Sequence, residues 1–429
     1  MNIGVLGLWH LGSVTAGALA ALGHRVVGLD ADESTVTNLN RGLAPVFEPG
    51  LQELITRGLS AGNLRFSSSL ADAKGCDVLW VTYDTPVDDD DHADAESVLA
   101  RIEAAMNAIG PETLVLVSSQ LPVGSIHRLE QSAGAGRAGV PPRMACSPEN
   151  LRLGRAVADF LHPKRIIAGV RSERDRELLR PLLGSISESI EWMSVESAEM
   201  TKHAINAFFA ASIAFANEIA TLCESAGADA KEVERGLKTD SRIGPGAYLA
   251  PGSAFAGGSL ARDVGFLTRT ALGHGLITPL LSSVLPSNDR HRHWAQRKLQ
   301  ELCVDLSGTK VAVWGLTYTP NTDTLRRSWS VELCEWLIRS GAKAQVHDPM
   351  AKALPVHWSG LVERFEHPID AVRGTQALVV ATDWPVYKTI SAGQLLRCTD
   401  RLAVLDANRF APNLAVAEDG LSYFAVGRP

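Results

Sequence analysis

Short apolar runs alternate with helix-forming segments in two separate parts of the chain. In the first part, the runs cover residues 3–8, 25–29, 78–82, 114–118 and 165–170. In the last part, they cover residues 310–316, 344–347, 377–381 and 403–405. Strands that are separated by helices form parallel sheets through crossover connections. Each part therefore predicts a doubly wound α/β domain.

A helical block lies between the two series of strands. Strand signals stop from residue 196 to about residue 300, and residues 197–226 form an Ala-rich run with apolar residues at helical spacing. We predict a central helical domain with one long helix between two Rossmann-like domains, with domain bounds 1–195, 196–300 and 301–429. The long helix is apolar on more than one face, at Ala207, Phe208, Phe209, Ile213, Ala214 and Phe215. Such a surface predicts a homodimer or a higher homo-oligomer.

The composition narrows the functional class. The chain has 429 residues and a formal net charge of −7, with 45% apolar and 21% charged residues. This composition is ordinary for a globular protein, and the mild acidity argues against a nucleic-acid partner. The six cysteines form no CxxC pair, so we expect neither a zinc site nor a disulfide framework. The acidic run from Asp88 to Asp91 is expected to be a solvated loop, and no metal is predicted.

The start of the sequence indicates its compartment. Met1 leads directly into the first apolar run, without the basic segment and cleavage site typical of exported proteins. No stretch reaches ~18 uninterrupted apolar residues, the length that spans a membrane. We therefore expect a cytoplasmic protein without a membrane partner.

The first apolar run leads into a glycine turn typical of dinucleotide sites. The turn Gly7, Leu8, Trp9, His10, Leu11 and Gly12 follows the GxGxxG frame, except that Trp9 replaces the middle glycine. In this frame the first glycine makes a tight turn, the second admits the pyrophosphate, and the third lets helix and strand approach. Asp30 ends the next strand, where a carboxylate binds ribose hydroxyls and disfavours a 2′-phosphate. The pattern predicts NAD, with Trp9 either crowding the pyrophosphate or packing locally.

Further motifs occur along the whole chain, at residues 36–51, 85–86, 121–124, 147–154, 163–169, 199–208, 217–218, 242–244, 255–263, 315–323 and 346–349. Together they resemble the motifs of the nucleotide-sugar dehydrogenase family, whose members oxidise UDP-glucose or GDP-mannose. The resemblance implies NAD-dependent oxidation of a primary alcohol, the sugar C6. In the family, a cysteine thiolate captures the resulting aldehyde as a thiohemiacetal, and a second oxidation leads through a thioester to the acid.

The resemblance places a serine at the position of the family's cysteine. The family pattern Phe-Gly-Gly-Ser-Cys-Phe-x-Lys-Asp, counted from Phe255 to Asp263, assigns the cysteine to Ser259. An unassisted serine hydroxyl is a poor nucleophile, so we expect the aldehyde as the main product. Three alternatives stay open: Ser259 as a nucleophile, oxidation of the aldehyde hydrate, and a non-catalytic binding protein. Cys146 is a further candidate for the missing thiol.

The resemblance also implies the residues of the site. The catalytic set is Lys202, Asn206, Asp263 and Glu149, with Ser259 in the nucleophile's place. Lys202 and Asn206 are one helical turn apart and lie on one helix face. Cofactor contacts are expected from the glycine turn (Gly7, Trp9, His10, Leu11, Gly12) and from Asp30, Thr85, Pro86, Gln120 and Arg326. Substrate contacts are expected from Glu149, Asn150, Leu151, Lys202, Asn206, Arg242, Tyr248, Phe255, Gly257 and Tyr318.

Four positions depart from the family pattern, namely Gln120, Leu153, Arg262 and Thr319. The family has a hydroxyl residue, a glutamate, a lysine and a basic residue at these positions. Each difference is either neutral drift or a sign of altered chemistry. The loss of a basic residue at Thr319 weakens the expectation of a diphosphate, so the sugar and the nucleobase stay open.

Overall fold

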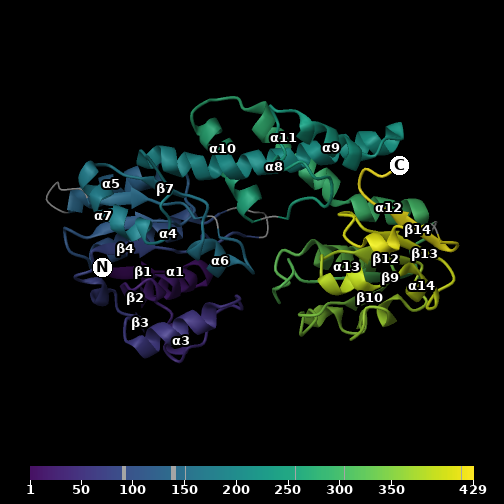
Figure 1. Ribbon diagram of the computed structural model, residues 1–429, viewed down its shortest axis with the longest axis horizontal. Helices are drawn as coiled ribbons and strands as arrows, with labels where there is room; N and C mark the ends of the chain where they lie inside the picture. The colour runs from purple at the N-terminus through teal and green to yellow at the C-terminus, as the bar shows by residue number, and fades with distance from the viewer. Residues whose placement is uncertain (89–92, 137–141, 150, 257, 304, 417) are drawn as a thin grey trace. The chain divides into compact units, whose positions relative to one another are not determined.

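The computed structural model describes residues 1–429 except 89–92, 137–141, 150, 257, 304 and 417 (Figure 1). The acidic run after Asp88 and the predicted substrate residues Asn150 and Gly257 lie outside the described residues. The contacts divide the chain into two compact units. One contains Met1–Ile205 and Gly265–Gly275, and the other contains Asn206–Val264 and Leu276–Pro429. The division into three domains at residues 195 and 300 stays a prediction.

The first unit is built on an eight-stranded sheet with the order β3-β2-β1-β4-β5-β6-β7-β8. The strands are β1 (Asn2–Leu6), β2 (Arg25–Leu29), β3 (Leu64–Ser67), β4 (Val78–Val81), β5 (Leu114–Val117), β6 (Met144–Cys146), β7 (Ile166–Gly169) and β8 (Ile190–Met193). The direction of winding reverses between β1 and β4, where doubly wound folds bind ligands. The described pairs are parallel except β6 and β7, which meet antiparallel at Cys146 and Gly169. The predicted doubly wound parallel sheet is confirmed except for this one pair, whose strands are connected through α6 (Ala156–Leu161).

Both faces of this sheet are covered by apolar residues. Successive strand residues point to opposite faces, so Ile3 and Val5 join one buried cluster and Leu6 joins another. The helices of this unit, besides α6, are α1 (His10–Ala21), α2 (Glu33–Asn40), α3 (Leu51–Ala61), α4 (Ala95–Met106), α5 (Ser125–Gly136) and α7 (Glu173–Gly184). At the start of α1, a Cβ atom on Gly12 would lie 1.7 Å from the Gly7 carbonyl oxygen. The third glycine of the turn is therefore required for α1 to approach β1.

Helix α8 (Val195–Ala226) has 32 residues and is the predicted long helix (Figure 1). It is followed by α9 (Ala230–Thr239), α10 (Ser259–Gly273), α11 (Pro279–Arg292) and α12 (Trp294–Leu302). In the described part of the chain, α8 alone is long and apolar enough to cross a membrane, and 44% of its most apolar window is buried. It also buries Glu199, Lys202, His203 and Asn206, each bonded to a protein group. This pattern is typical of the core helix of a globular protein.

The second unit contains a six-stranded parallel sheet with the order β11-β10-β9-β12-β13-β14. The strands are β9 (Lys310–Trp314), β10 (Lys343–His347), β11 (Val362–Arg364), β12 (Ala377–Val380), β13 (Leu402–Leu405) and β14 (Leu421–Phe424), with α13 (Trp329–Arg339) and α14 (Ala392–Leu396) between them. The winding again reverses, here between β9 and β12. The prediction of a second doubly wound domain is confirmed.

The five strands that sequence patterns did not predict are β3, β6, β8, β11 and β14. Four of them form the edges of the two sheets. An edge strand is covered on fewer sides and needs fewer apolar residues, so its apolar signal is weak. The fifth, β6, has three residues and is too short to show a period.

Three aspartates lie at the carboxyl ends of strands in the second sheet. Asp348 accepts hydrogen bonds from four backbone N–H groups, which hold its pKa below the usual range although burial opposes them. Asp406 accepts from two backbone N–H groups and from the Tyr423 hydroxyl. Asp383 accepts from Asn408 Nδ2 at 3.2 and 3.3 Å. Burial raises the pKa of Asp383 to about 6.

We expect Asp383→Asn to stabilise the protein at neutral pH. A carboxyl group with a raised folded-state pKa destabilises the fold once it ionises, and this penalty vanishes below its unfolded-state pKa. Wild type should therefore lose stability as the pH rises from about 4 to 6, by at most about 3 kcal/mol. Thermal unfolding at pH 4.5 and 7.5 measures this. Asp419→Asn, at an exposed residue, is the control; equal melting temperatures of Asp383→Asn and wild type at pH 7.5 would contradict the prediction.

We expect Gly12→Ala to destabilise the first unit. The added methyl group meets a backbone carbonyl that cannot rotate away, so the cost should reach or exceed the ~1–3 kcal/mol typical of overpacking. Thermal unfolding without ligand measures the loss. The control is Gly184→Ala, because a Cβ atom there meets no other atom within 4 Å. An unchanged melting temperature for Gly12→Ala would show that helix and strand can separate at no cost.

Candidate functional site

The turn between β1 and α1 has the geometry of a dinucleotide-binding turn. Gly7 has φ +94°, and a Cβ atom there would lie 2.6 Å from the Tyr83 ring. Helix α1 begins after Trp9, whose side chain makes no capping hydrogen bond and is 50% exposed. The first N–H groups of a helix have no partner within the helix and attract phosphate. Trp9 therefore replaces a glycine beside groups that are suited to a pyrophosphate.

Asp30 lies beside this turn. Its carboxylate accepts a hydrogen bond from the N–H of Leu8 at 2.7 Å and another from the N–H of Asp32 at 3.0 Å. These bonds fix the carboxylate at the carboxyl end of β2, where the fingerprint places the group that binds ribose.

His10 is connected to a distant loop through a buried carboxylate. The His10 Nε2 atom lies 2.9 Å from Glu48 Oε2. Glu48 also accepts hydrogen bonds from the N–H groups of Gly154 at 2.9 Å and Ala156 at 2.8 Å. Glu48 therefore joins the glycine turn to the segment that starts α6.

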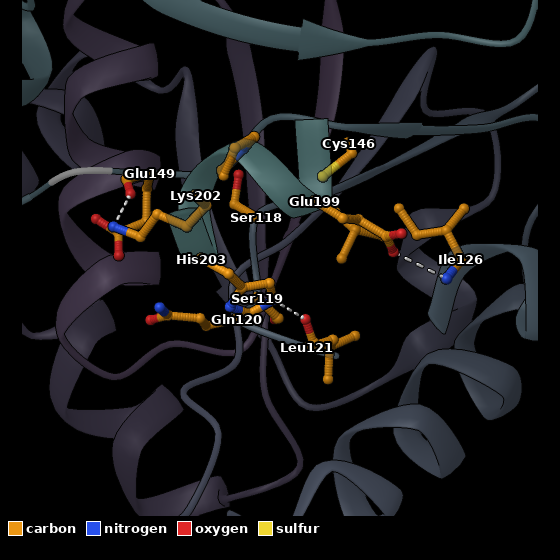
Figure 2. Close-up of a pocket in the computed structure, with 12 residues that line it drawn as sticks. Ser118, Ser119, Gln120, Leu121, Ile126, Cys146, Glu149, Glu199, Lys202 and His203 are labelled. Atoms are coloured by element: carbon orange, nitrogen blue, oxygen red, sulfur yellow. Dashed lines mark hydrogen bonds between the residues drawn. The ribbon is translucent and has the colours of Figure 1, made fainter. Parts of the chain in front are cut away.

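A pocket lies beside the first turns of α8, within the first unit (Figure 2). Its lining comes from the ends of β5 and β6 and from α8, and consists of Val117, Ser118, Ser119, Gln120, Leu121, Ile126, Cys146, Pro148, Glu149, Glu199, Lys202 and His203. Figure 2 shows Lys202, Glu199 and His203 extending from neighbouring positions of α8 toward different parts of the lining. The sequence predicted Gln120, Glu149 and Lys202 for the site, and the pocket contains all three.

Lys202 is buried and contacts the loop that carries Glu149. Its Nζ atom donates a hydrogen bond to the backbone carbonyl of Glu149 at 2.6 Å. The Glu149 carboxylate accepts a hydrogen bond from the N–H of Leu151 at 2.5 Å. The ammonium and this loop are thus fixed relative to each other, and a substrate oxygen nearby would meet a positive charge in a poorly solvated place.

Two predicted cofactor residues contact each other at the carboxyl ends of β4 and β5. The buried hydroxyl of Thr85 donates a hydrogen bond to the backbone carbonyl of Gln120 at 2.5 Å. Pro86 follows on the exposed side of the same loop, and its carbonyl accepts a hydrogen bond from the N–H of Asp94. The structure therefore brings together the loops that follow β4 and β5.

Cys146 lines the pocket, but its thiol does not have the properties of a nucleophile. Burial, together with the negative charge of Glu199, raises the pKa of Cys146 well above the ordinary value. The thiolate is the reactive form, so at neutral pH this side chain behaves as a small apolar residue.

The remaining predicted catalytic residues lie in the second unit, near the start of α10. Asn206 Nδ2 donates a hydrogen bond to the buried Asp263 carboxylate at 2.6 Å. The Arg262 guanidinium lies 3.8 Å from Asp263 and 3.5 Å from the hydroxyl of Ser259. Ser259 is exposed at the first position of α10. Its hydroxyl therefore contacts a cation, which cannot take up a proton.

The loop before Ser259 is held by four side chains from other segments. Asn217 and Asn408 accept hydrogen bonds from the N–H groups of Gly252 and Ser253, and His291 Nε2 lies 2.8 Å from the Gly252 carbonyl oxygen. Asn288 binds both the N–H and the carbonyl of Phe255, at 3.0 and 2.8 Å. Phe255 itself is buried. This predicted substrate residue therefore has a fixed backbone.

The other predicted residues are at the surface and are not brought to these clusters by any described contact. Arg242 is exposed and pairs with Asp240 at 2.7 Å. Tyr248 packs against Phe209 with ring centroids 5.6 Å apart. Tyr318 follows β9 and is partly exposed, and Arg326 is exposed in the same segment.

Sequence patterns missed the residues that hold the site loops in place. These are Glu48, Thr82, Glu199, His203, Asn217, Asn288, His291 and Asn408. Glu199, His203 and Asn217 belong to motifs that the sequence analysis recognised, and a polar residue within an apolar helix was the available signal. For Asn288 and Asn408 the sequence offers no such signal.

Three domain profiles of one family match the chain in order. The profiles of the UDP-glucose/GDP-mannose dehydrogenase family match residues 1–186 with the NAD binding domain, residues 196–290 with the central domain and residues 312–412 with the UDP binding domain. The expected resemblance is therefore confirmed over most of the chain.

Individual relatives agree with this result. The chain is 34% identical to a UDP-glucose 6-dehydrogenase of Pseudomonas aeruginosa, with 100% of the chain and 98% of the relative covered. It is 31% identical to the UDP-glucose 6-dehydrogenase YwqF of Bacillus subtilis, with the same coverage. A UDP-glucose dehydrogenase from Pyrobaculum islandicum has the same fold, with a TM-score of 0.87, 33% identity and coverage of 100% and 98%. These relationships do not favour the alternative of a non-catalytic binding protein. The chain belongs to the UDP-glucose/GDP-mannose dehydrogenase family and is an NAD-dependent nucleotide-sugar dehydrogenase.

Proposed function

We propose that the protein oxidises the C6 hydroxymethyl group of a UDP-hexose to the aldehyde and releases that aldehyde as its main product. Relatives named UDP-glucose 6-dehydrogenases support the substrate class. Release of the aldehyde is supported by one observation, the exposed hydroxyl of Ser259 beside the Arg262 guanidinium. We also propose a cytoplasmic location.

The residues around β1 and α1 fit NAD. Gly7 and Gly12 allow the tight turn, and the α1 N-terminus offers N–H groups for the pyrophosphate. Asp30 would accept hydrogen bonds from the ribose, and Thr85, Pro86, Gln120 and the exposed Arg326 are the remaining candidates to hold the cofactor. The chemistry that NAD supplies is acceptance of a hydride from the alcohol carbon.

We assign the first oxidation to side chains that would polarise the hydroxyl oxygen of the substrate. Lys202, whose ammonium is buried and oriented by the Glu149 carbonyl, would stabilise the alkoxide that forms as the hydroxyl proton leaves. Asn206, oriented by Asp263, would donate a hydrogen bond to a substrate oxygen. Glu149 is the candidate for proton transfer near C6.

The second oxidation needs either a covalent adduct or the aldehyde hydrate. A serine adduct requires a base for the Ser259 hydroxyl, and the contact described for that hydroxyl is a guanidinium. The raised pKa of Cys146 argues against a replacement thiolate. Oxidation of the hydrate would require the aldehyde to stay bound while water adds to it, and we propose that the aldehyde leaves first.

We expect wild type to form one NADH per molecule of substrate. Ser259→Ala should keep this ratio and most of the rate, whereas Lys202→Ala should lower the rate by ~10²- to 10⁴-fold. Ser259→Cys should form two NADH and the acid, because a thiolate next to Arg262 can hold the aldehyde. NADH absorbance and product mass measure both quantities.

Other ratios of NADH to substrate would indicate other mechanisms. Two NADH in both wild type and Ser259→Ala would show oxidation of the hydrate and would contradict release of the aldehyde. Two NADH in wild type but one in Ser259→Ala would show that the serine is a nucleophile. One NADH in Ser259→Cys would show that Ser259 does not occupy the nucleophile's position.

We further propose that the protein is a homodimer through α8 and its neighbours in the second unit. Phe208, Phe215 and Leu222 are 67%, 49% and 64% exposed and lie seven residues apart, so they form one stripe along α8. Ile277 and Leu280, around the start of α11, are 89% and 72% exposed. Large exposed apolar surfaces of this kind are typical of interfaces.

We expect light scattering at micromolar concentration to give about twice the chain mass of 45.9 kDa. Phe215→Glu places a charge in the stripe and should shift the protein toward one chain mass without lowering the melting temperature of the units. Lys352→Glu, at an exposed residue outside the stripe, is the charge-changing control. A single chain mass for wild type would contradict the proposal.

A further inference from the structure

One turn of α8 binds several backbone groups of a single loop. The loop, defined here as residues 120–126, follows β5 and includes the first two residues of α5. Glu199 accepts hydrogen bonds from the N–H groups of Gly124 at 2.7 Å and Ile126 at 3.1 Å. His203 Nε2 lies 2.8 Å from the carbonyl oxygen of Leu121 and donates to it (Figure 2). Both side chains are buried, with 6% and 1% of their surface exposed.

The same turn also carries Lys202. Residues three and four positions apart lie on one side of a helix, so Glu199, Lys202 and His203 share a face. Lys202 binds the Glu149 carbonyl, while Glu199 and His203 bind the neighbouring loop. The position of this loop relative to the ammonium is therefore set by side chains of one rigid helical turn.

The backbone of this loop has an unusual conformation and contains N–H groups that need hydrogen-bond partners. Gly124 has φ +89°, and the N–H groups at the start of α5 have no partners within the helix. A carboxylate near a helix N-terminus satisfies such groups and interacts favourably with the helix dipole. At the other end of the loop, the Gln120 carbonyl accepts the Thr85 hydroxyl, so Gln120 is fixed from both sides.

We propose that Glu199 and His203 are positioning residues that hold the loop 120–126, and with it Gln120, in the geometry that binds the cofactor. The inference rests on the proposed assignment of Gln120 and Thr85 to the cofactor site. It assigns no direct contact with substrate or cofactor to either residue. Their effect reaches the reaction through the loop, while the bond between Lys202 and the Glu149 carbonyl stays intact.

The test compares the KM for NAD with kcat. A hydrogen bond to a charged group contributes about 1.5–3 kcal/mol, so Glu199→Gln should raise the KM for NAD ~10- to 100-fold. The change in kcat should be much smaller, because Lys202 keeps its partner. The matched control is Glu196→Gln, which removes a carboxylate from the same helix that pairs with Arg171 at 2.7 Å at the surface. It should leave the KM for NAD unchanged.

A pair of variants at His203 provides an independent test. His203→Gln keeps an N–H donor for the Leu121 carbonyl, whereas His203→Phe removes it and keeps a ring next to Phe266. The KM for NAD should rise in His203→Phe and stay near the wild-type value in His203→Gln. This pair decides the question if Glu199→Gln does not fold.

The pH profile separates positioning from general stability. Protonation of Glu199 turns one acceptor oxygen into a hydroxyl that faces an N–H group, so the KM for NAD should rise as the pH falls. Burial raises the pKa of Glu199, although its two N–H donors oppose this. The KM for NAD should therefore begin to rise at a pH above the usual carboxyl range. The titratable groups around it are His203 and Glu196 on α8 and Cys146 on β6. The rise should persist in His203→Gln and disappear in Glu199→Gln, where the KM is high at every pH.

Two results would overturn the inference. One is a lower melting temperature of Glu199→Gln with an unchanged KM for NAD and an unchanged pH profile. The other is an equal KM in His203→Phe and His203→Gln. Gln120→Ala separates these failures from a failure of the proposed site, because an unchanged KM for NAD in that variant would remove Gln120 from the cofactor site.

Discussion

The burial of charged side chains on α8 is the constraint on which the first unit's site depends. Glu199 and Lys202 lie inside the protein, where an ionised group is costly unless it has hydrogen-bond partners. The partners are backbone groups of two loops, the N–H groups that begin α5 and the carbonyl of Glu149. Helix α8 can therefore pack against the sheet only if both loops adopt one geometry. The hydrogen bonds that stabilise the buried charges thus also fix the loops that line the pocket.

Ser259 stands at the position that the family resemblance assigns to the nucleophile, and the structure shows which contacts surround it. Lys202 binds the Glu149 carbonyl, the Glu149 carboxylate binds the Leu151 N–H, and Asn206 binds Asp263. The Arg262 guanidinium lies beside both Asp263 and Ser259. An exposed serine at the first position of α10 leaves the loop before it fixed through Gly252, Ser253 and Phe255. In the proposed mechanism, Lys202 and Asn206 would serve the first oxidation through contacts other than the Ser259 hydroxyl. The proposal therefore makes the side chain at position 259 decide between a two-electron and a four-electron product.

The sequence predicted the order of elements better than the contacts of the site. The central strands and the long helix were visible because buried strands are continuously apolar and helices repeat every 3.6 residues. Edge strands such as β3 and β14, and the three-residue strand β6, carry no such signal. The glycine turn was predicted from a local motif, whereas the proposed catalytic residues came from the resemblance to the family. Glu48 and Glu199 could not be assigned a role, because their partners lie 106 and 75 residues away in sequence.

Glu48 and Glu199 both bind free N–H groups at the N-termini of helices. Glu48 occupies the N–H groups at the start of α6, and Glu199 occupies those at the start of α5. Helix α1 differs, since it has neither an acidic residue in its first turn nor a side-chain cap. A carboxylate there would compete with a pyrophosphate for the same N–H groups. Carboxylates from distant parts of the chain therefore close the N-termini of α5 and α6, whereas the N-terminus of α1 is suited to the anion of a cofactor.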